Sequence, residues 1–182
     1  MTTMTLEKPM LPPFAYTPKP YKGPSREEII AMRREFLTPA LVTYFREPIM
    51  IDEGKMQYLF DEKGKRYLDA FAGIVSVSVG HCHPKVVERV RQQTGTLQHT
   101  TTIYLHPAVV QFAEKLAEKM PSGLTRSYFT NSGSEANEVA ILSAREYTGN
   151  QDVVALRNGY HGGTSVPMSL TAHGNWKFKS NN

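Results

Sequence analysis

The strongest constraint on the fold is an alternation of strand and helix signals between residues 126 and 156. Arg126–Thr130 has the character of a short strand, and Glu135–Tyr147 has the apolar periodicity of an amphipathic helix. Asp152–Leu156 then resembles a second strand. Strand, helix and strand form a βαβ unit, and such units build parallel sheets. The sequence therefore predicts an α/β fold.

Length, charge and cysteine content exclude several classes of protein. The 182 residues correspond to about one domain. The longest apolar stretch, Phe71–Val79, is shorter than the ~20 residues of a membrane span. The single cysteine, Cys82, excludes an intrachain disulfide framework. A net charge of +4 without a basic run argues against specific nucleic-acid binding.

Proline dominates residues 1–24, which predicts an extended arm outside the core, with a polyproline ligand as the alternative. The arm lacks the apolar core of a signal peptide and has no arginine before Arg26, so it is a poor transit peptide. Ser25–Glu28 has the pattern of a capping box, and it predicts a helix that Pro39 ends.

Three short strands and two helices are expected next. Asp61–Gly64 is a turn signal that joins the second and third strands into a hairpin. The predicted strands are Ile49–Ile51, Met56–Phe60 and Arg66–Leu68, and the predicted helices begin at Pro84 and Pro107.

The polar segment between the first strand and the helix of the βαβ pattern suits a phosphate. Asn131–Glu138 places Gly133 and Ser134 at a helix start, where backbone N–H groups are free and the helix dipole is positive. The segment is neither a Walker A loop nor a GxGxxG fingerprint. An ordinary N-cap is the alternative interpretation.

A second polar loop, Asn158–Thr164, follows the next predicted strand. In open α/β sheets ligands collect outside the carboxyl ends of the strands, where both loops would lie. Tyr160 and His161, flanked by glycines, can offer a flat face to a planar ring. The alternative is a tight turn in which Tyr160 packs in the core.

Taken together, these motifs resemble a known family. NSGSEANE at 131–138, YHG at 160–162 and GHCHP at 80–84 are similar to the class III pyridoxal-phosphate-dependent aminotransferases of fold type I. The run 58–86 is similar to the alanine–glyoxylate aminotransferase 2 type. The resemblance covers about 44–173. It implies an incomplete fold, with 25–80 in the small domain and 81–182 as the first part of the cofactor-binding large domain.

The resemblance assigns roles to individual residues. Gly133 and Ser134 match the positions whose backbone groups hold the phosphate of pyridoxal 5′-phosphate. Tyr160 matches the aromatic residue that stacks on the pyridine ring, and His161 is its neighbour at the ring edge. For Glu138, a supporting role near the site and a solvated or dipole-pairing carboxylate are both open.

Ile74 and Val75 match a stretch that lines the substrate pocket in relatives. Ornithine aminotransferases have a tyrosine near the position of Ile74, so its absence favours a small substrate. A zinc site at His81, Cys82 and His83 is not expected, because no second ligand cluster has the required spacing. Cys82 also lacks a base and an oxyanion site, so it is not expected to be a nucleophile.

The implied activity is transfer of an amino group from an amino acid such as alanine to a 2-oxo acid such as glyoxylate. In the family, the Schiff-base lysine and the carboxylate opposite the pyridinium nitrogen lie well after the YHG loop. This sequence stops at Asn182, and Lys177 and Lys179 come too early to match that lysine. We therefore expect no catalytic residue in this fragment and no activity of the fragment alone.

Partners and compartment follow from the same resemblance. The expected partners are a small amino acid and a 2-oxo acid, without nucleic acid or membrane; homodimers occur in the family, and the assembly of this chain is open. The family suggests mitochondria, whereas the lack of a visible presequence makes the cytoplasm the alternative. Two further alternatives are a non-catalytic product that binds pyridoxal phosphate or a full-length subunit, and an unrelated α/β phosphate-binding module.

Overall fold

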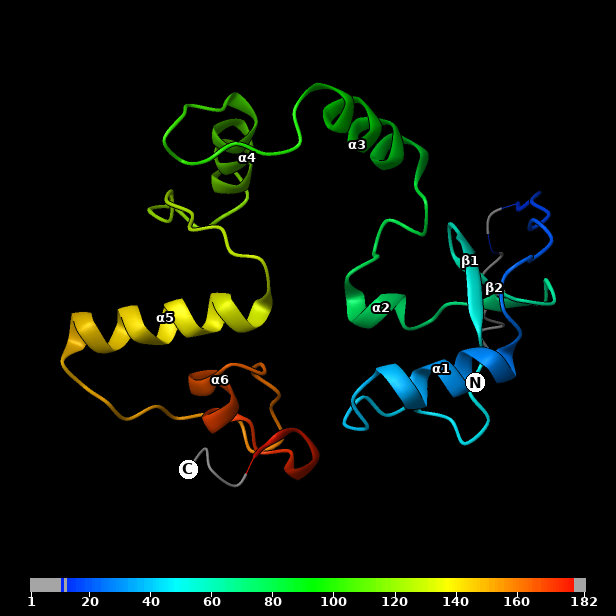
Figure 1. The fold of residues 1–182 in the computed structure, drawn as a ribbon. Helices are drawn as coiled ribbons and strands as arrows, with labels where there is room; N and C mark the ends of the chain where they lie inside the picture. Colours follow the sequence, from blue (N-terminus) through cyan, green and yellow to red (C-terminus); the bar gives the residue numbers. More distant parts are fainter. Residues whose placement is uncertain (1–10, 12, 179–182) are drawn as a thin grey trace, which may run out of the picture. The chain divides into compact units, whose positions relative to one another are not determined.

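A computed structural model describes residue 11 and residues 13–178 (Figure 1). The chain divides into two compact units, Met1–Thr100 and Thr101–Asn182. Helices and a β-sheet are both present, as the α/β prediction requires. The expected division at residue 81 concerns the domains of a whole enzyme, and it stays a prediction.

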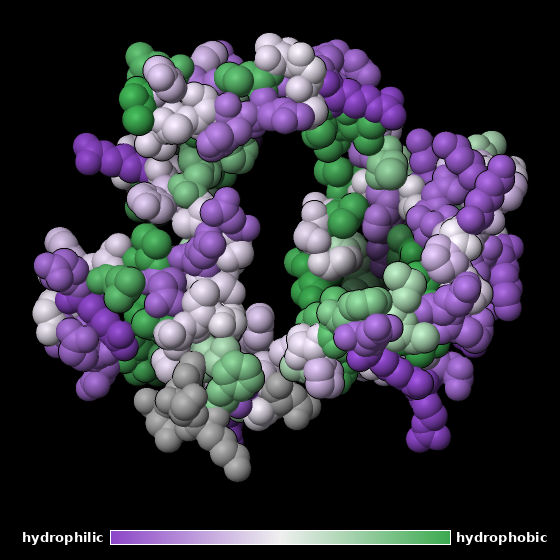
Figure 2. All heavy atoms as spheres, in the orientation of Figure 1, coloured by the Kyte–Doolittle hydropathy of each residue, from purple (hydrophilic) through white to green (hydrophobic). Residues whose placement is uncertain are grey.

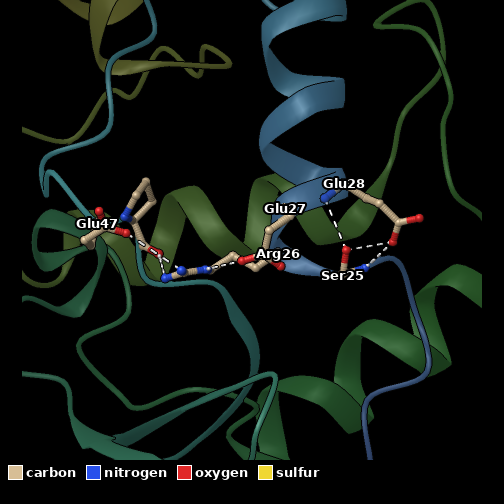
Figure 3. A network of polar contacts seen from close by, with 6 residues as sticks. Ser25, Arg26, Glu27, Glu28 and Glu47 are labelled. Carbon is tan, nitrogen blue, oxygen red and sulfur yellow. Dashed lines mark hydrogen bonds and ion pairs between the residues drawn. The ribbon is translucent and has the colours of Figure 1, made fainter.

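The first helix, α1 (Arg26–Phe36), begins at the predicted capping box (Figure 3). The Ser25 hydroxyl accepts a hydrogen bond from the backbone N–H of Glu28 at 3.2 Å, and the Glu28 carboxylate accepts one from the Ser25 N–H at 2.7 Å. These bonds from Ser25, first from its backbone and then from its side chain, lower the pKa of Glu28. Arg26 adds an ion pair with Glu47 at 3.7 Å. Local chemistry therefore starts this helix where the sequence predicts it.

The sheet of the first unit is antiparallel, with the order β1-β2-β3. Strand β1 (Ile51–Lys55) pairs with β2 (Tyr58–Asp61), which pairs with β3 (Arg66–Leu68). The predicted turn is confirmed, since the Asp61 carboxylate accepts from the N–H groups of Lys63 and Lys65. Strand β1 starts later than the predicted Ile49–Ile51, because the tight connection to β2 sets the register and places Lys55 opposite Tyr58.

Aromatic rings form the core of this unit. Tyr58 and Phe60, two residues apart on β2, are buried on the same face of the sheet. The ring of Phe14 lies 4.5 Å from that of Tyr58, and the ring of Tyr16 lies 5.7 Å from that of Phe60. The guanidinium of Arg66 lies 4.6 Å from the centre of the Tyr58 ring. The expectation that the arm stays outside the core is therefore wrong for Phe14 and Tyr16, because alternate residues of an extended segment can cover one sheet face.

Two helices begin with proline, as predicted. In the first unit α3 spans Pro84–Thr96, and in the second unit α4 spans Pro107–Ala117. Proline is tolerated at the first helical position because its missing N–H has no acceptor there in any case. The ring of Phe112, on α4, lies 5.3 Å from the ring of Phe129, which follows the helix in the chain.

The second unit continues with the long helix α5 (Gly133–Thr148), which begins two residues before the predicted start. It ends at Gly149, whose φ of 71° is the left-handed conformation typical of a glycine cap. The sequence did not indicate the short helix α6 (Ser165–Leu170) or the 3-10 turn η1 (Gly174–Trp176). Helix α6 packs beside α5 (Figure 1).

The two strands predicted around α5 are not formed. Arg126–Thr130 and Asp152–Leu156 contain no assigned strand, and within residues 13–178 neither segment pairs with another strand. Parallel strands need neighbours that crossover connections bring from elsewhere in the chain. The described residues supply no such neighbour, so the strand signal of these segments finds no partner.

Much apolar surface remains exposed. Apolar residues are prominent on the face shown in Figure 2. In the second unit the exposed apolar side chains include Ile103, Leu105, Val154 and Leu156. No helix among the described residues has the length and apolar character needed to cross a bilayer.

Candidate active site

The start of α5 offers two backbone donors. The Ser132 hydroxyl accepts from the N–H of Glu135 at 3.2 Å, and the Glu135 carboxylate turns back to the N–H of Asn131 at 2.7 Å. Within the described part of the chain, no acceptor binds the N–H groups of Gly133 and Ser134, which lie in the first helical turn. A Cβ atom added at Gly133 would meet nothing within 4 Å. The helix start is therefore open and rich in donors.

The glycine loop after Tyr160 lies directly against this helix start. The N–H of Gly163 donates to the Ser134 hydroxyl oxygen at 2.9 Å. Gly162 is buried with φ of 135°, and a Cβ atom there would stand only 2.9 Å from the Cα of Ser134. Only glycine fits this approach without a shift of the backbone. Ser134 thus belongs to the helix start and to the loop contact at once, and within residues 13–178 its hydroxyl donates to no acceptor.

The backbone on both sides of Tyr160 is also fixed. The N–H of His161 donates to the hydroxyl of Thr171 at 3.0 Å, and the carbonyl of Gly159 accepts from Ala172 at 3.3 Å. Thr171 is fully buried, and its hydroxyl donates to the carbonyl of Pro167. The bonds from His161 to Thr171 and from Ala172 to Gly159 therefore hold the backbone on either side of Tyr160.

The ring of Tyr160 is accessible. Its residue is 59% exposed, and the ring edge lies against Trp176 with centroids 5.9 Å apart and an interplanar angle of 73°. The alternative in which Tyr160 packs in the core is therefore wrong, because the structure leaves the ring open to solvent. His161 is half-buried, and its carbonyl accepts from the side-chain amide of Asn137 at 2.7 Å. Tyr160 is therefore an exposed aromatic residue on the same loop as Gly163, which binds Ser134 at the helix start.

Glu138 has partners that the sequence did not reveal. Its carboxylate accepts from the Thr164 hydroxyl at 2.6 Å and from the N–H of Val166 at 3.3 Å. The interpretation as a solvated carboxylate is wrong, because the side chain is half-buried and hydrogen-bonded to the start of α6. The one sequence feature that could have indicated these contacts is spacing. Ser134 and Glu138 are four residues apart, which places them on the same face of the helix.

Ile74 and Val75 belong to the first unit, on the turn α2 (Ala72–Val75). All four residues of α2 have positive φ, between 49° and 59°. Three of them are not glycine, and a left-handed conformation is costly for L-residues, above all for β-branched ones. The structure exposes Ile74 to 72% and Val75 to 81%. A strained turn therefore presents two apolar side chains to solvent.

Asp69 holds this turn in place. One carboxylate oxygen accepts from the N–H groups of Phe71 and Ala72 at 2.9 Å each, and the other lies 2.7 Å from Nε2 of His81. The hydrogen bond with His81, followed by those from the two N–H groups, lowers the pKa of Asp69. The Asp69 side chain is almost fully buried. The pair Asp69–His81 thus links the turn to the segment before α3.

The histidines and the cysteine before α3 have local roles. His81 binds Asp69 and exchanges two backbone hydrogen bonds with Met56. Cys82 is exposed, and His83 precedes the first residue of α3. In the part of the chain that the structure describes, no group of three or more His, Cys, Asp or Glu side chains is arranged to hold a metal ion.

Comparisons with known proteins match most of this chain, including the residues described above. A family profile described as aminotransferase class-III matches residues 42–181. Alanine–glyoxylate aminotransferase 2 homolog 2, mitochondrial, from Arabidopsis thaliana is 56% identical over 168 residues, which are 92% of this chain and 35% of that protein. Mitochondrial alanine–glyoxylate aminotransferase 2 from Homo sapiens is 42% identical over 172 residues, which are 94% of this chain and 34% of that protein. The chain spans about a third of the length of these curated relatives.

Solved structures show the same relationship in three dimensions. A phospholyase from Arthrobacter, in complex with phosphoethanolamine, superposes with a TM-score of 0.74 and 37% identity, and the match covers 79% of this chain and 33% of that one. The fold is thus part of the fold of the pyridoxal-phosphate-dependent transaminases. The motifs, the profile match and the shared fold agree, and the chain belongs to the class III aminotransferase family.

Proposed function

We propose that this chain supplies the phosphate-binding and ring-stacking part of a pyridoxal 5′-phosphate site in an aminotransferase. The proposed reaction moves an amino group from an amino acid such as alanine to a 2-oxo acid such as glyoxylate. Support comes from membership of the class III family, whose enzymes use this cofactor, and from the alanine–glyoxylate aminotransferases among the relatives.

One observation carries the proposal: the open helix start and the aromatic loop meet at Ser134. The N–H groups of Gly133 and Ser134 have no acceptor among the described residues, and the Gly163 N–H binds the Ser134 hydroxyl. The helix dipole adds partial positive charge where the phosphate would bind. The helix start can therefore hold the phosphate of a ligand while the neighbouring loop holds the ring of the same ligand.

Each residue has a distinct part in binding. Gly133 and Ser134 donate N–H groups to the phosphate, and the Ser134 hydroxyl donates its proton to another phosphate oxygen. Tyr160 covers one face of the ring, with His161 at the ring edge. When bound, the cofactor supplies the electron sink that amino-group exchange requires. The protein orients it and keeps water from one face of the ring.

The proposal extends to the substrate. Ile74 and Val75 line its pocket, where an apolar surface without a tyrosine favours a small amino acid over a long cationic one. Their exposure on the strained turn α2 supports this role, because strained turns are concentrated at functional sites.

Location and assembly are also proposed from the family. We propose mitochondria as the location, with support from relatives that are named as mitochondrial, and a homodimer as the assembly. Residues 81–182 are then the first part of the large domain. The exposed apolar side chains Ile103, Leu105 and Val154 support burial against further protein.

A titration with pyridoxal 5′-phosphate tests the cofactor site. Trp176 is the only tryptophan and lies 5.9 Å from the Tyr160 ring, so its fluorescence reports on a ligand stacked there. We expect quenching that saturates with added cofactor. Tyr160→Ala should weaken binding about tenfold through lost stacking. Gly133→Val should also weaken binding, because its side chain fills the space meant for the phosphate.

Matched variants separate binding from folding. The Cβ atom of Gly133→Val meets nothing in the free protein, so its thermal unfolding should match that of the unmodified chain. Tyr147→Ala removes an exposed tyrosine at the far end of α5 and should leave the affinity unchanged. Equal affinity in Tyr160→Ala, Gly133→Val and the unmodified chain would contradict the proposed site. Tight binding of inorganic phosphate with no effect of Tyr160→Ala would favour the simple phosphate-binding module.

A further inference from the structure

We infer that Glu138 is a positioning residue. Its carboxylate holds the Tyr160 loop against the proposed phosphate-binding start of α5, so that one ligand can contact both the loop and the helix start. The inference rests on the proposed cofactor site and adds to it a residue that touches neither phosphate nor ring. Nothing in the motifs distinguishes this carboxylate from a solvated one, and its role follows from its contacts.

Three residues on one face of α5 hold the loop and the start of α6. Ser134, Asn137 and Glu138 are spaced i, i+3 and i+4, which places them on the same side of the helix. Ser134 accepts from Gly163 at 2.9 Å, and Asn137 donates to the carbonyl of His161 at 2.7 Å. Glu138 binds the next residues along the chain. The face therefore fastens the loop at successive points.

Glu138 makes the strongest of these contacts. Its carboxylate accepts two hydrogen bonds, from the Thr164 hydroxyl at 2.6 Å and from the Val166 N–H at 3.3 Å. Within residues 13–178 the Thr164 hydroxyl has one other acceptor, the Ser134 carbonyl, at a longer 3.4 Å. Hydrogen bonds to an ionised acceptor are roughly twice as strong as neutral ones. Loss of Glu138 would leave half-buried donors without their main partner.

The two parts of the proposed site depend on Glu138 to different degrees. The phosphate donors are the first N–H groups of α5, and the helix itself fixes their geometry. Tyr160 lies on the loop, whose position depends on contacts made across 24 to 29 residues of sequence. A change at Glu138 should therefore affect contacts with the ring and spare contacts with the phosphate. That difference separates positioning from general structural support.

The experiment compares two ligands on the full chain. Pyridoxine 5′-phosphate has the ring and the phosphate but no aldehyde, so it forms no adduct with lysine, and its binding is followed by Trp176 fluorescence. Inorganic phosphate is followed by the amide chemical shifts of Gly133 and Ser134. For Glu138→Ala we expect about tenfold weaker binding of pyridoxine 5′-phosphate, which corresponds to about 1.4 kcal/mol. The phosphate affinity should change less than twofold.

Conservative and control variants sharpen the result. Glu138→Gln keeps an oxygen acceptor for Thr164 and should recover most of the affinity. Glu146→Ala removes an exposed glutamate from the same helix and should match the unmodified chain. If Glu138→Ala fails to fold, Thr164→Val removes the donor in its place and should give the same selective loss. Combining Thr164→Val with Glu138→Gln should then add little to either change alone.

The possible failures are distinguishable. If the unmodified chain does not bind pyridoxine 5′-phosphate, the proposed cofactor site fails and the inference fails with it. If the unmodified chain binds and Glu138→Ala binds equally well, the inference alone is overturned. A parallel fall in the affinities for pyridoxine 5′-phosphate and for inorganic phosphate would show general structural support, and would also overturn it.

Discussion

The two units of the chain are stabilised in different ways. In the first unit, Tyr58 and Phe60 are buried under the rings of Phe14 and Tyr16. In the second unit, the candidate site is held by hydrogen bonds among partly exposed groups, such as the bond from the Gly163 N–H to the Ser134 hydroxyl. Burial of aromatic rings is non-directional and large, whereas hydrogen bonds are directional and individually modest. The first arrangement stabilises a sheet, and the second sets the geometry of a site.

Strand formation shows the same contrast. Strands β1, β2 and β3 follow one another through short connections, so each finds its antiparallel partner nearby in the chain. Arg126–Thr130 and Asp152–Leu156 have comparable strand character but no partner among the described residues. A strand is stabilised by cross-strand pairs and not by its own propensity. Strand character therefore produced a strand only where a neighbour was within reach.

The largest effect is expected at the aromatic core of the first unit. Phe60 is 2% exposed, so Phe60→Ala should lower the free energy of unfolding by about 3–5 kcal/mol through lost burial and the cavity that remains. Chemical denaturation followed by far-UV circular dichroism measures this change. Phe36→Ala, at an exposed phenylalanine at the end of α1, is the matched control and should cost far less. Equal costs would contradict the assignment of the core.

A smaller effect is expected at the pair Asp69–His81. Asp69→Ala removes the acceptor for His81 and for two backbone N–H groups, and should cost about 2–3 kcal/mol. Because the pKa of Asp69 is lower in the folded chain than in the unfolded one, its contribution is present above the ordinary carboxyl pKa of about 3.9. The contribution is lost as the pH falls through the lowered pKa.

Thermal unfolding of the unmodified chain and of Asp69→Ala at a series of pH values measures this dependence. The difference between their melting temperatures should be largest above about pH 5 and should shrink toward about pH 2. Asp152→Ala is a control, because Asp152 is exposed and its carboxylate makes no hydrogen bond or ion pair within residues 13–178. A difference that grows with acid would contradict the role of the ionised Asp69 carboxylate.

Close packing at the candidate site gives the next effect. Gly162→Ala places a methyl group 2.7 Å from the Ser134 hydroxyl, and should cost about 2 kcal/mol through overpacking and backbone strain. Gly123→Ala is the control, because Gly123 also has positive φ, at 91°, but nothing within 4 Å of its Cβ position. Hydrogen exchange of the Gly163 N–H reports on the contact with Ser134. Slow exchange that persists in Gly162→Ala would show that the loop does not need this close approach.

The smallest effects are expected at the helix starts. Ser25→Ala and Ser132→Ala each remove an N-cap and should each cost about 1 kcal/mol. Only Ser132→Ala should also weaken the binding of pyridoxal 5′-phosphate, because it loosens the turn that holds the N–H groups of Gly133. Thermal unfolding and the Trp176 titration measure the two effects separately. Weaker binding in Ser25→Ala would remove the distinction between the two helix starts.

Features that depend on neighbours in sequence were determined by the sequence alone. The capping box at Ser25, the proline starts at Pro84 and Pro107 and the turn at Asp61 are confirmed. Each depends on groups within about four residues, whose geometry the local backbone sets. The motifs around Gly133 and Tyr160 likewise indicated the family, because their order and spacing are read directly from the chain.

Only the tertiary structure decided which distant groups meet. It brought Thr164 to Glu138 across 26 residues, laid Phe14 on Tyr58, and left the strand signals around α5 without partners. Asp69 shows the same limit, because a carboxylate near a left-handed turn has no distinctive sequence pattern. Such contacts depend on how separate elements pack, and packing is a property of the whole arrangement and not of any one segment.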